Sequence, residues 1–191
     1  MKPSDFNTYK TRYRTAIRNV LAEVAKGRLD EAAFPAYSHP NPLINWLFWQ
    51  RLRKVTDYIQ RPIPYEKILD FGCGSGVMLP YLANHSSHVT AMDLDMLPLQ
   101  LVQKHIPLAA NIEVVDPSQT QIKALPQHTY DLIIALDVLE HVHDLPGTLT
   151  DLLALLKPEG QLIVSVPTEN ILYQIGRKLA GMIWFWGDCL E

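Results

Sequence analysis

The spacing of apolar residues changes near residue 64, and this change divides the chain into parts. Before it, apolar residues recur every three or four positions, which is typical of amphipathic helices. After it, short apolar runs alternate with helical patterns, which is typical of a parallel sheet with helical crossovers. The pattern predicts an N-terminal helical extension or lid at residues 1–63, an α/β domain at 64–167, and a C-terminal helix with an aromatic tail at 168–191.

Two helices are predicted in the N-terminal part. The first begins near Ser4, which can cap a helix, and ends before Gly27. The second begins at Asn41-Pro42, a cap followed by a residue with a helical φ, and ends near residue 60. The predicted inward face of the first helix is Phe6, Tyr9, Tyr13, Ala16, Val20 and Val24. The predicted inward residues of the second are Leu43, Leu47, Leu52, Val55 and Ile59, with Arg51, Arg53 and Lys54 outward.

Five strands are predicted after residue 64. The fourth, YDLIIAL, is almost continuously apolar, as a strand buried on both faces should be. Strands that alternate with helices predict a doubly wound, mainly parallel α/β sheet with right-handed crossovers. The predicted strands are 67–71, 88–92, 111–115, 130–136 and 161–166, with 157–160 as a turn before the last.

Composition narrows the class of protein. The net charge of −3 gives no reason to expect a nucleic-acid partner, because phosphate binding needs a basic surface. Two cysteines form no disulfide framework, and no apolar run is long enough for a membrane span. The N-terminus carries no apolar core of signal-peptide type. We therefore expect a cytoplasmic protein without a transmembrane segment.

The segment ILDFGCGSG, residues 68–76, carries the strongest indication of chemistry. A predicted strand runs into Gly72, Gly74 and Gly76, and a helix follows. Glycines let the backbone turn tightly and approach a ligand, and the helix N-terminus offers free N–H groups. The alternative is a tight strand-to-helix turn that binds nothing.

Three acidic residues end the first three predicted strands. Asp70 would repel a pyrophosphate on the glycine loop but would suit an ammonium or sulfonium group. Asp93 stands where doubly wound folds place an acid that binds ribose hydroxyls, although it could instead cap the next helix. Asp116 could accept a hydrogen bond from an adenine amino group, or form an ordinary Asp-Pro turn.

These motifs resemble class I S-adenosylmethionine-dependent methyltransferases, with their Rossmann-like fold. An acidic residue followed by GxGxG is similar to the first motif of that family, and the order and spacing of the later motifs are similar too. The resemblance covers about residues 64–167. The matching segments are residues 70–76, AMDLD at 91–95, VVDPS at 114–118, YDLIIALDVLEHV at 130–142 and LLKPEGQLIVSVP at 155–167.

The resemblance implies a role for each matching residue around S-adenosylmethionine. Asp70 would lie near the amino group of the cofactor, and Asp93 would hold the ribose hydroxyls. Leu94 would pack on adenine, Asp116 would reach its amino group, and Leu136 would wall the site near the transferable methyl. The residues implied to line the methionine part are Gly72, Cys73, Gly74 and Gly76.

The segment DVLEHV, residues 137–142, is similar to the small-molecule branch that includes ubiquinone-type O-methyltransferases. In that subgroup an equivalent pattern can hold a divalent metal, which here would bind Asp137, Glu140 and His141. The sequence has Asp137 where the subgroup usually has Glu. His141, with Asp137, is also a candidate catalytic residue, because a neutral imidazole can accept a proton near neutrality. The alternative is local hydrogen bonding at a helix start.

The expected function is methyl transfer to a small or medium-sized acceptor by direct displacement, giving S-adenosylhomocysteine. Tyr37, His39, Trp46 and Trp49 are candidates for shaping the acceptor pocket, with core packing as the alternative for both tryptophans. The family sheet normally has seven strands, so the C-terminal edge looks truncated. The expected consequence is a homodimer through that edge, contact with a membrane surface, or poor activity. Two alternatives are a non-catalytic S-adenosylmethionine-binding or scaffold protein and a nicotinamide-dependent oxidoreductase; the latter prefers GxGxxG.

Overall fold

The computed structural model describes residues 3–24, 37, 39–59, 64–118 and 120–166, with side chains from residue 6 onward. Helix α1 (Pro3–Glu23) already includes Ser4, so the predicted cap at Ser4 is wrong. The Gly27 stop and the C-terminal part at 168–191 lie outside the described residues. Within the described residues, no helix combines the length and the hydrophobicity that crossing a bilayer requires.

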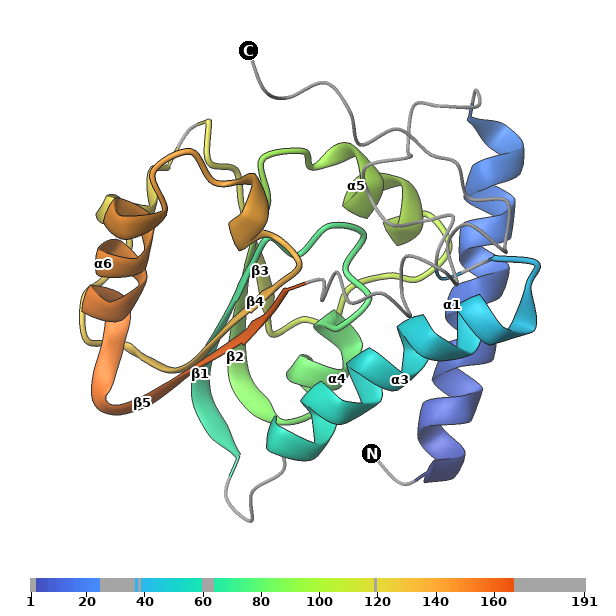
Figure 1. The fold of residues 1–191 in the computed structure, drawn as a ribbon, viewed down its shortest axis with the longest axis horizontal. Coiled ribbons are helices and arrows are strands. Elements are labelled where there is room, and N and C mark those ends of the chain that lie inside the picture. The colour runs from blue at the N-terminus through green and yellow to red at the C-terminus, as the bar shows by residue number, and fades with distance from the viewer. Residues whose placement is uncertain (1–2, 25–36, 38, 60–63, 119, 167–191) are drawn as a thin grey trace, which may run out of the picture.

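Five strands form one sheet in the order β3-β2-β1-β4-β5, and every neighbouring pair is parallel (Figure 1). The prediction of a doubly wound α/β sheet is therefore confirmed. This order places the carboxyl ends of β1 and β4 side by side, at the point where the direction of winding reverses. The strands are β1 (Tyr65–Phe71), β2 (Ser86–Met92), β3 (Ile112–Val115), β4 (Tyr130–Leu136) and β5 (Leu156–Ser165).

Helices cover both faces of the sheet (Figure 1). One face packs in a single hydrophobic core with both N-terminal helices, and the other packs against α6. The helices of the first face are α1 (Pro3–Glu23), α3 (Pro42–Ile59), α4 (Leu79–Ala83) and α5 (Leu97–Gln103). The second face carries α6 (Leu145–Leu155), with short 3-10 helices η2 (Ile122–Ala124) and η3 (Leu139–His141) beside the strands.

The predicted inward face of α1 is confirmed, since Tyr13, Ala16 and Val20 are buried and the others pack against the same core. In α3, Asn41 caps the helix as predicted: its Oδ1 accepts a hydrogen bond from the Leu43 N–H at 2.9 Å. The rest of α3 differs from the prediction in its first turns.

Leu43 and Leu47 are 62% and 45% exposed, so their predicted inward positions are wrong. The buried stripe of α3 starts at the polar Asn45, and its first buried apolar residue is Trp49, followed by Leu52. A helical period fixes the spacing of a stripe, but the point where the helix reaches its neighbours depends on tertiary packing.

The predicted turn at residues 157–160 is also wrong, because β5 begins at Leu156 and includes them. The β4–β5 pairing shifts register between Tyr130 and Leu132. Such a bulge lets a strand carry Pro158 and Gly160, which a regular central strand would disfavour. Among the described strands, β5 pairs with β4 alone and forms one edge of the sheet.

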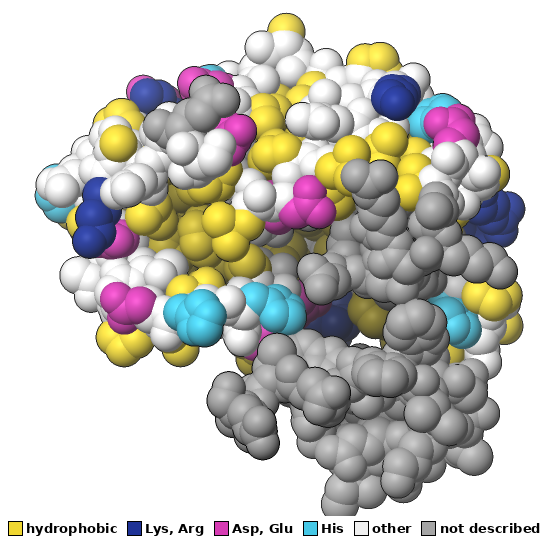
Figure 2. Space-filling view, turned by 90° about the horizontal axis from the view of Figure 1, so that it is seen from above, with side chains coloured by type: hydrophobic (Ala, Val, Ile, Leu, Met, Phe, Trp, Pro, Cys, Tyr) yellow, Lys and Arg dark blue, Asp and Glu magenta, His cyan; other side chains and the backbone are white. Residues whose placement is uncertain are grey.

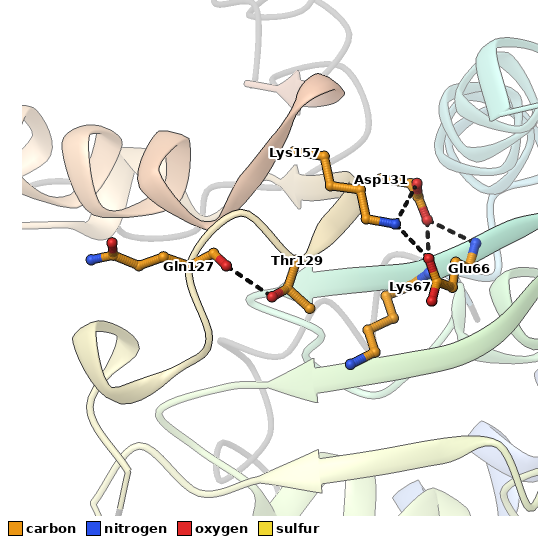
Figure 3. Close-up of polar contacts among 6 residues, drawn as sticks. All are labelled: Glu66, Lys67, Gln127, Thr129, Asp131 and Lys157. Carbon is orange, nitrogen blue, oxygen red and sulfur yellow. Dashed lines mark hydrogen bonds and ion pairs between the residues drawn. The ribbon is translucent and has the colours of Figure 1, made fainter.

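At the amino ends of the strands, Asp131 of β4 connects β1 and β5 (Figure 3). Its Oδ2 accepts hydrogen bonds from the backbone N–H groups of Glu66 and Lys67 at 2.7 and 2.9 Å. Lys157 of β5 donates to Asp131 Oδ1 at 3.2 Å and to Glu66 Oε2 at 2.6 Å. One carboxylate therefore joins three strands away from the carboxyl edge of the sheet.

We expect Asp131→Asn to lower the free energy of unfolding at pH 7 by about 1.5–3 kcal/mol, the range for hydrogen bonds to charged groups. Burial alone would raise the pKa of Asp131, but the hydrogen bonds from Lys67, Lys157 and Glu66 lower it overall. A carboxyl with a depressed folded pKa stabilises the fold above its unfolded pKa, and this stability is lost as pH falls through the folded pKa.

The wild type should therefore lose more stability than Asp131→Asn on acidification below about pH 4, as measured by urea unfolding at a series of pH values. Asp57→Asn, at an exposed position of α3, is the control and should leave the acid slope unchanged. Equal acid slopes for the wild type and Asp131→Asn would contradict the assignment.

Candidate functional site

The candidate site lies at the carboxyl ends of β1, β2 and β4, which meet at one edge of the sheet. Ligands of doubly wound sheets bind at this edge, at the reversal point between β1 and β4. Seen from that end, hydrophobic and acidic side chains lie around a hollowed part of the surface (Figure 2).

The loop after β1 turns through left-handed conformations, with φ of +77° at Gly72, +52° at Gly74 and +77° at Gly76. A Cβ on Gly72 would overlap the side chain of Val138, and one on Gly76 would lie 2.6 Å from Leu99 Cδ1. At Gly74, by contrast, no described atom lies within 4 Å of the position that a Cβ would take. Two glycines are therefore required by packing, while Gly74 exposes backbone that a ligand can approach.

Asp93, at the end of β2, holds this loop. Its Oδ2 accepts a hydrogen bond from the Gly74 N–H at 2.7 Å, and its Oδ1 accepts one from the Asp95 N–H at 3.0 Å. Burial raises the pKa of Asp93, although these amide hydrogen bonds oppose the rise. The following helix begins at Leu97, so the alternative of Asp93 as a helix cap is wrong.

Asp70, near the end of β1, is 3% exposed. Burial, with the neighbouring Asp93 as a second cause, raises the pKa of Asp70 to about 8. A buried carboxyl either stays protonated or is balanced by a cation. The position therefore suits a ligand that carries an ammonium or sulfonium group, because that cation would let the buried carboxyl ionise.

A cavity joins this edge of the sheet to the N-terminal helices. The sheet side includes Asp70 and Leu136, and the helix side includes Arg51. The N-terminal part of the chain therefore forms one wall of the site. The lining residues are Tyr37, Phe48, Arg51, Leu52, Val55, Asp70, Gly72, Cys73, Met78, Leu136, Asp137 and Ser165.

Asp137 follows β4 in a left-handed conformation, with φ of +53°. It forms an ion pair with Arg51, and its Oδ1 accepts a hydrogen bond from Ser165 Oγ at 2.9 Å. Arg51 was predicted to face outward, which is wrong, so sequence reasoning missed this site residue. Arg51 lies three residues after Phe48 and four before Val55, and both of these residues line the cavity. This helical spacing indicates that the three side chains share one face of α3.

The predicted metal site is not assembled. Among the described side chains, no group of three His, Cys, Asp or Glu residues is placed to hold a metal ion. Asp137 is turned toward Arg51 and Ser165, while Glu140 and His141 are exposed on η3. The catalytic roles predicted for Asp137 and His141 stay predictions.

The predicted adenine side lies on the ends of β2 and β3. Leu94 is 92% exposed, so its side chain is available to cover a ring. Asp116 accepts a hydrogen bond from the Ser118 N–H at 2.8 Å, and hydrogen bonding to Ser118 lowers the pKa of Asp116. This is the Asp-Pro turn of the alternative interpretation, and contact with adenine stays a prediction.

The four residues predicted to shape the acceptor pocket lie in different environments. Tyr37 lines the cavity, whereas Trp49 is buried in the core at 1% exposure. Trp46 is exposed, and the Nδ1 atom of His39 accepts a hydrogen bond from the Asn41 N–H at 3.0 Å. Core packing, the alternative for both tryptophans, is therefore confirmed for Trp49 and wrong for Trp46.

Comparison with solved structures supports the fold. An N-methyltransferase, NodS from Bradyrhizobium japonicum, in complex with S-adenosylhomocysteine, superposes with a TM-score of 0.53 at 20% identity, over 78% of this chain and 71% of that chain. The [4+2]-cyclase SpnF superposes with a TM-score of 0.52 at 17% identity, over 64% of this chain and 48% of that chain. At these identities the likeness concerns the fold alone.

Comparison of sequences addresses the family. The ubiquinone biosynthesis O-methyltransferase of Marinobacter nauticus is 34% identical over 110 residues, which cover 55% of this chain and 45% of that relative. The chain thus spans less than half the length of the curated relatives it matches. The family model described as a methyltransferase domain matches residues 17–189. Because that match covers most of the chain and agrees with the glycine loop and the strand-end acids, the protein belongs to the methyltransferase family, in its class I S-adenosylmethionine-dependent branch.

Proposed function

We propose that this protein binds S-adenosylmethionine at the carboxyl edge of its sheet and transfers the methyl group to a small or medium-sized acceptor. The observation that carries the proposal is the hydrogen bond between Asp93 and the Gly74 N–H, beside the buried Asp70. This contact assembles a glycine loop and two acids from neighbouring strands before any ligand arrives. Such preorganisation lowers the entropic cost of binding.

The residues available fit the donor molecule from one end to the other. Asp70 would balance the ammonium group, and the open backbone at Gly74 would lie beside the methionine part. Asp93 would bind the ribose hydroxyls through the lone pairs that its backbone contacts leave free. Leu94 would cover the adenine ring, and Asp116 would accept a hydrogen bond from its amino group. Gly72, Cys73, Gly76 and Leu136 would shape the loop and the wall around the methyl group.

When bound, S-adenosylmethionine supplies an activated methyl group, which a nucleophilic acceptor atom takes as the carbon–sulfur bond breaks and sulfur keeps the electron pair. The task of the protein is then to orient the acceptor and exclude water. The cavity wall of Tyr37, Phe48 and Leu52 would exclude water. Asp137, held by Arg51 and Ser165, would position the acceptor, and His141 would take its proton where one must be lost.

The setting that we propose is the cytoplasm, where the buried thiol of Cys73 would remain reduced. We further propose a homodimer through the sheet edge at β5, which among the described strands pairs with β4 alone. Both proposals are independent of the cofactor site.

A non-catalytic S-adenosylmethionine-binding protein is the main alternative. The fold alone does not decide between a methyltransferase and this alternative, since a protein named as a [4+2]-cyclase shares the fold. A methyl-transfer assay beside a binding assay distinguishes the two. A nicotinamide-dependent oxidoreductase fits less well, since the buried Asp70 would lie beside its pyrophosphate.

Calorimetric titration with S-adenosylhomocysteine should give saturable binding, while NADH should give none. Asp93→Ala should weaken binding by about 10-fold to 100-fold, because it removes charge-assisted hydrogen bonds to both the ribose and the Gly74 N–H. Asp144→Ala is the matched control: Asp144 Oδ1 accepts a comparable hydrogen bond from the Gly147 N–H at the start of α6. That variant should lose some stability and keep its affinity. A folded wild type that does not bind S-adenosylhomocysteine would refute the proposal.

Binding should also depend on pH through Asp70. Because its pKa is raised to about 8, the carboxyl is protonated at pH 7 and must lose its proton to balance an ammonium group. Affinity for S-adenosylhomocysteine should therefore rise between pH 6 and pH 8, by at most about tenfold per pH unit. Titrations in buffers of different ionisation enthalpy should detect the released proton. The Asp70→Asn variant measures the pH dependence that comes from the ligand itself. If its affinity changes with pH as steeply as that of the wild type, Asp70 is not the group that releases the proton.

The glycine loop offers a third test. Gly72→Ala should destabilise the fold, because its Cβ would overlap Val138. Gly74→Ala meets no described neighbour, so it should cost about 1–2 kcal/mol for the left-handed backbone and, beyond that, weaken S-adenosylhomocysteine binding at least tenfold. Thermal unfolding and calorimetry on both variants separate the two effects. Unchanged affinity in Gly74→Ala would place the ligand elsewhere.

A further inference from the structure

We propose that Tyr13 of α1 is a positioning residue that holds the glycine loop in its binding conformation, and that α1 is thereby part of the cofactor site. This inference rests on the proposed function. It goes beyond it because it assigns a role in binding to a helix that lies more than 60 positions from the loop in sequence.

Two tyrosines of α1 reach the glycine loop. The hydroxyl of Tyr13 forms a hydrogen bond with Ser75 Oγ and lies 3.3 Å from the carbonyl oxygen of Ser75. The hydroxyl of Tyr9 donates a hydrogen bond to the carbonyl oxygen of Val77. Ser75 and Val77 are the two residues next to Gly76, so α1 holds the loop on both sides of its last left-handed glycine.

The loop needs such contacts because glycine restricts the backbone so little. Three left-handed glycines within five residues would leave an unsupported loop many conformations. The ligand side of the loop is held by β2, through the hydrogen bonds of Asp93 and of the Met92 carbonyl oxygen. The tyrosines of α1 supply the support on the opposite side.

Tyr13 is well suited to this role because its own position is fixed. It is 1% exposed, and its ring packs against Tyr9, Tyr37 and Trp49 with centroid distances of 5.8, 6.2 and 6.0 Å. Burial also raises the pKa of Tyr13 far above its usual value, so the hydroxyl keeps its proton at any working pH. A rigid ring therefore presents one constant hydrogen-bonding group to Ser75.

A consequence for affinity follows from the population of the binding conformation. If only a fraction of molecules holds the loop in the binding conformation, the observed affinity equals the intrinsic affinity multiplied by that fraction. Removing the Tyr13 hydroxyl should lower this fraction without touching the ligand. Coupling is reciprocal, so a ligand that fixes the loop should also stabilise the docking of α1.

The test compares two tyrosines that lose equivalent hydroxyl groups. Tyr13→Phe should weaken S-adenosylhomocysteine binding by about threefold to tenfold, the range expected for one net hydrogen bond. Tyr130→Phe is the matched control, because the buried Tyr130 hydroxyl donates to Thr90 Oγ at 3.1 Å, between β4 and β2 and outside the loop. Both variants should lose a similar amount of thermal stability, and Tyr130→Phe should keep the affinity of the wild type. Equal affinity losses in both would overturn the inference, because they would reflect general destabilisation.

A double-mutant cycle with Ser75→Ala identifies the contact itself. If Tyr13 acts through Ser75, the double variant should bind about as weakly as the weaker single variant, whereas additive losses would reject this route. In the wild type, S-adenosylhomocysteine should slow hydrogen exchange of α1 amides, and Tyr13→Phe should reduce this protection. A wild type that binds S-adenosylhomocysteine while Tyr13→Phe binds equally well would refute the inference and leave the proposed function intact. Absence of binding by the wild type would refute both.

Discussion

The conformation of the loop after β1 constrains most of the structure around it. The chain leaves a buried strand and must reach α4 within a few residues, and it does so through three left-handed glycines. That path is available only where side chains from other elements fill the space that the glycines leave. Val138 fills it at Gly72, and Leu79 and Leu99 fill it at Gly76. The segment after β4 and the helices α4 and α5 thus pack against the loop at Gly72 and Gly76, whereas the loop stays open at Gly74.

The site is held together by contacts that are distant in sequence. Arg51 of α3 pairs with Asp137 after β4, and Ser165 at the end of β5 shares the same carboxylate oxygen. The N-terminal helices also share one hydrophobic core with the sheet. A wall of the cavity that shares the core of the domain cannot move without exposing apolar surface, and that cost favours a fixed wall over a freely moving lid.

The sequence predicted the elements that their own composition determines. It did not predict the features that depend on contacts between elements distant in sequence. The apolar run 130–136 defined β4 to the residue, because a strand buried on both faces has an unmistakable composition. Pro158 and Gly160 suggested a turn, but the bulge between β4 and β5 absorbs them, and that compensation is made by the neighbouring strand. The exposure of Leu43 and the inward position of Arg51 likewise depend on where α3 meets the sheet, which its own sequence does not contain. For the same reason the Asp137, Glu140 and His141 pattern did not reveal that Arg51 would take the carboxylate.

The electrostatics of the edge distinguish between the ligands that such a fold can hold. Many doubly wound folds use a glycine loop for phosphates, and the loop itself cannot tell one anionic ligand from another. Here two carboxyl groups, Asp70 and Asp93, lie close enough for the second to raise the pKa of the first. A pyrophosphate beside them would raise the pKa of Asp70 further and keep the carboxyl neutral, whereas a cationic group would let Asp70 ionise and form the ion pair that burial alone suppresses. The choice of a sulfonium and ammonium ligand therefore rests on the pair of acids more than on the glycines, and the fold contributes by bringing the ends of β1 and β2 together.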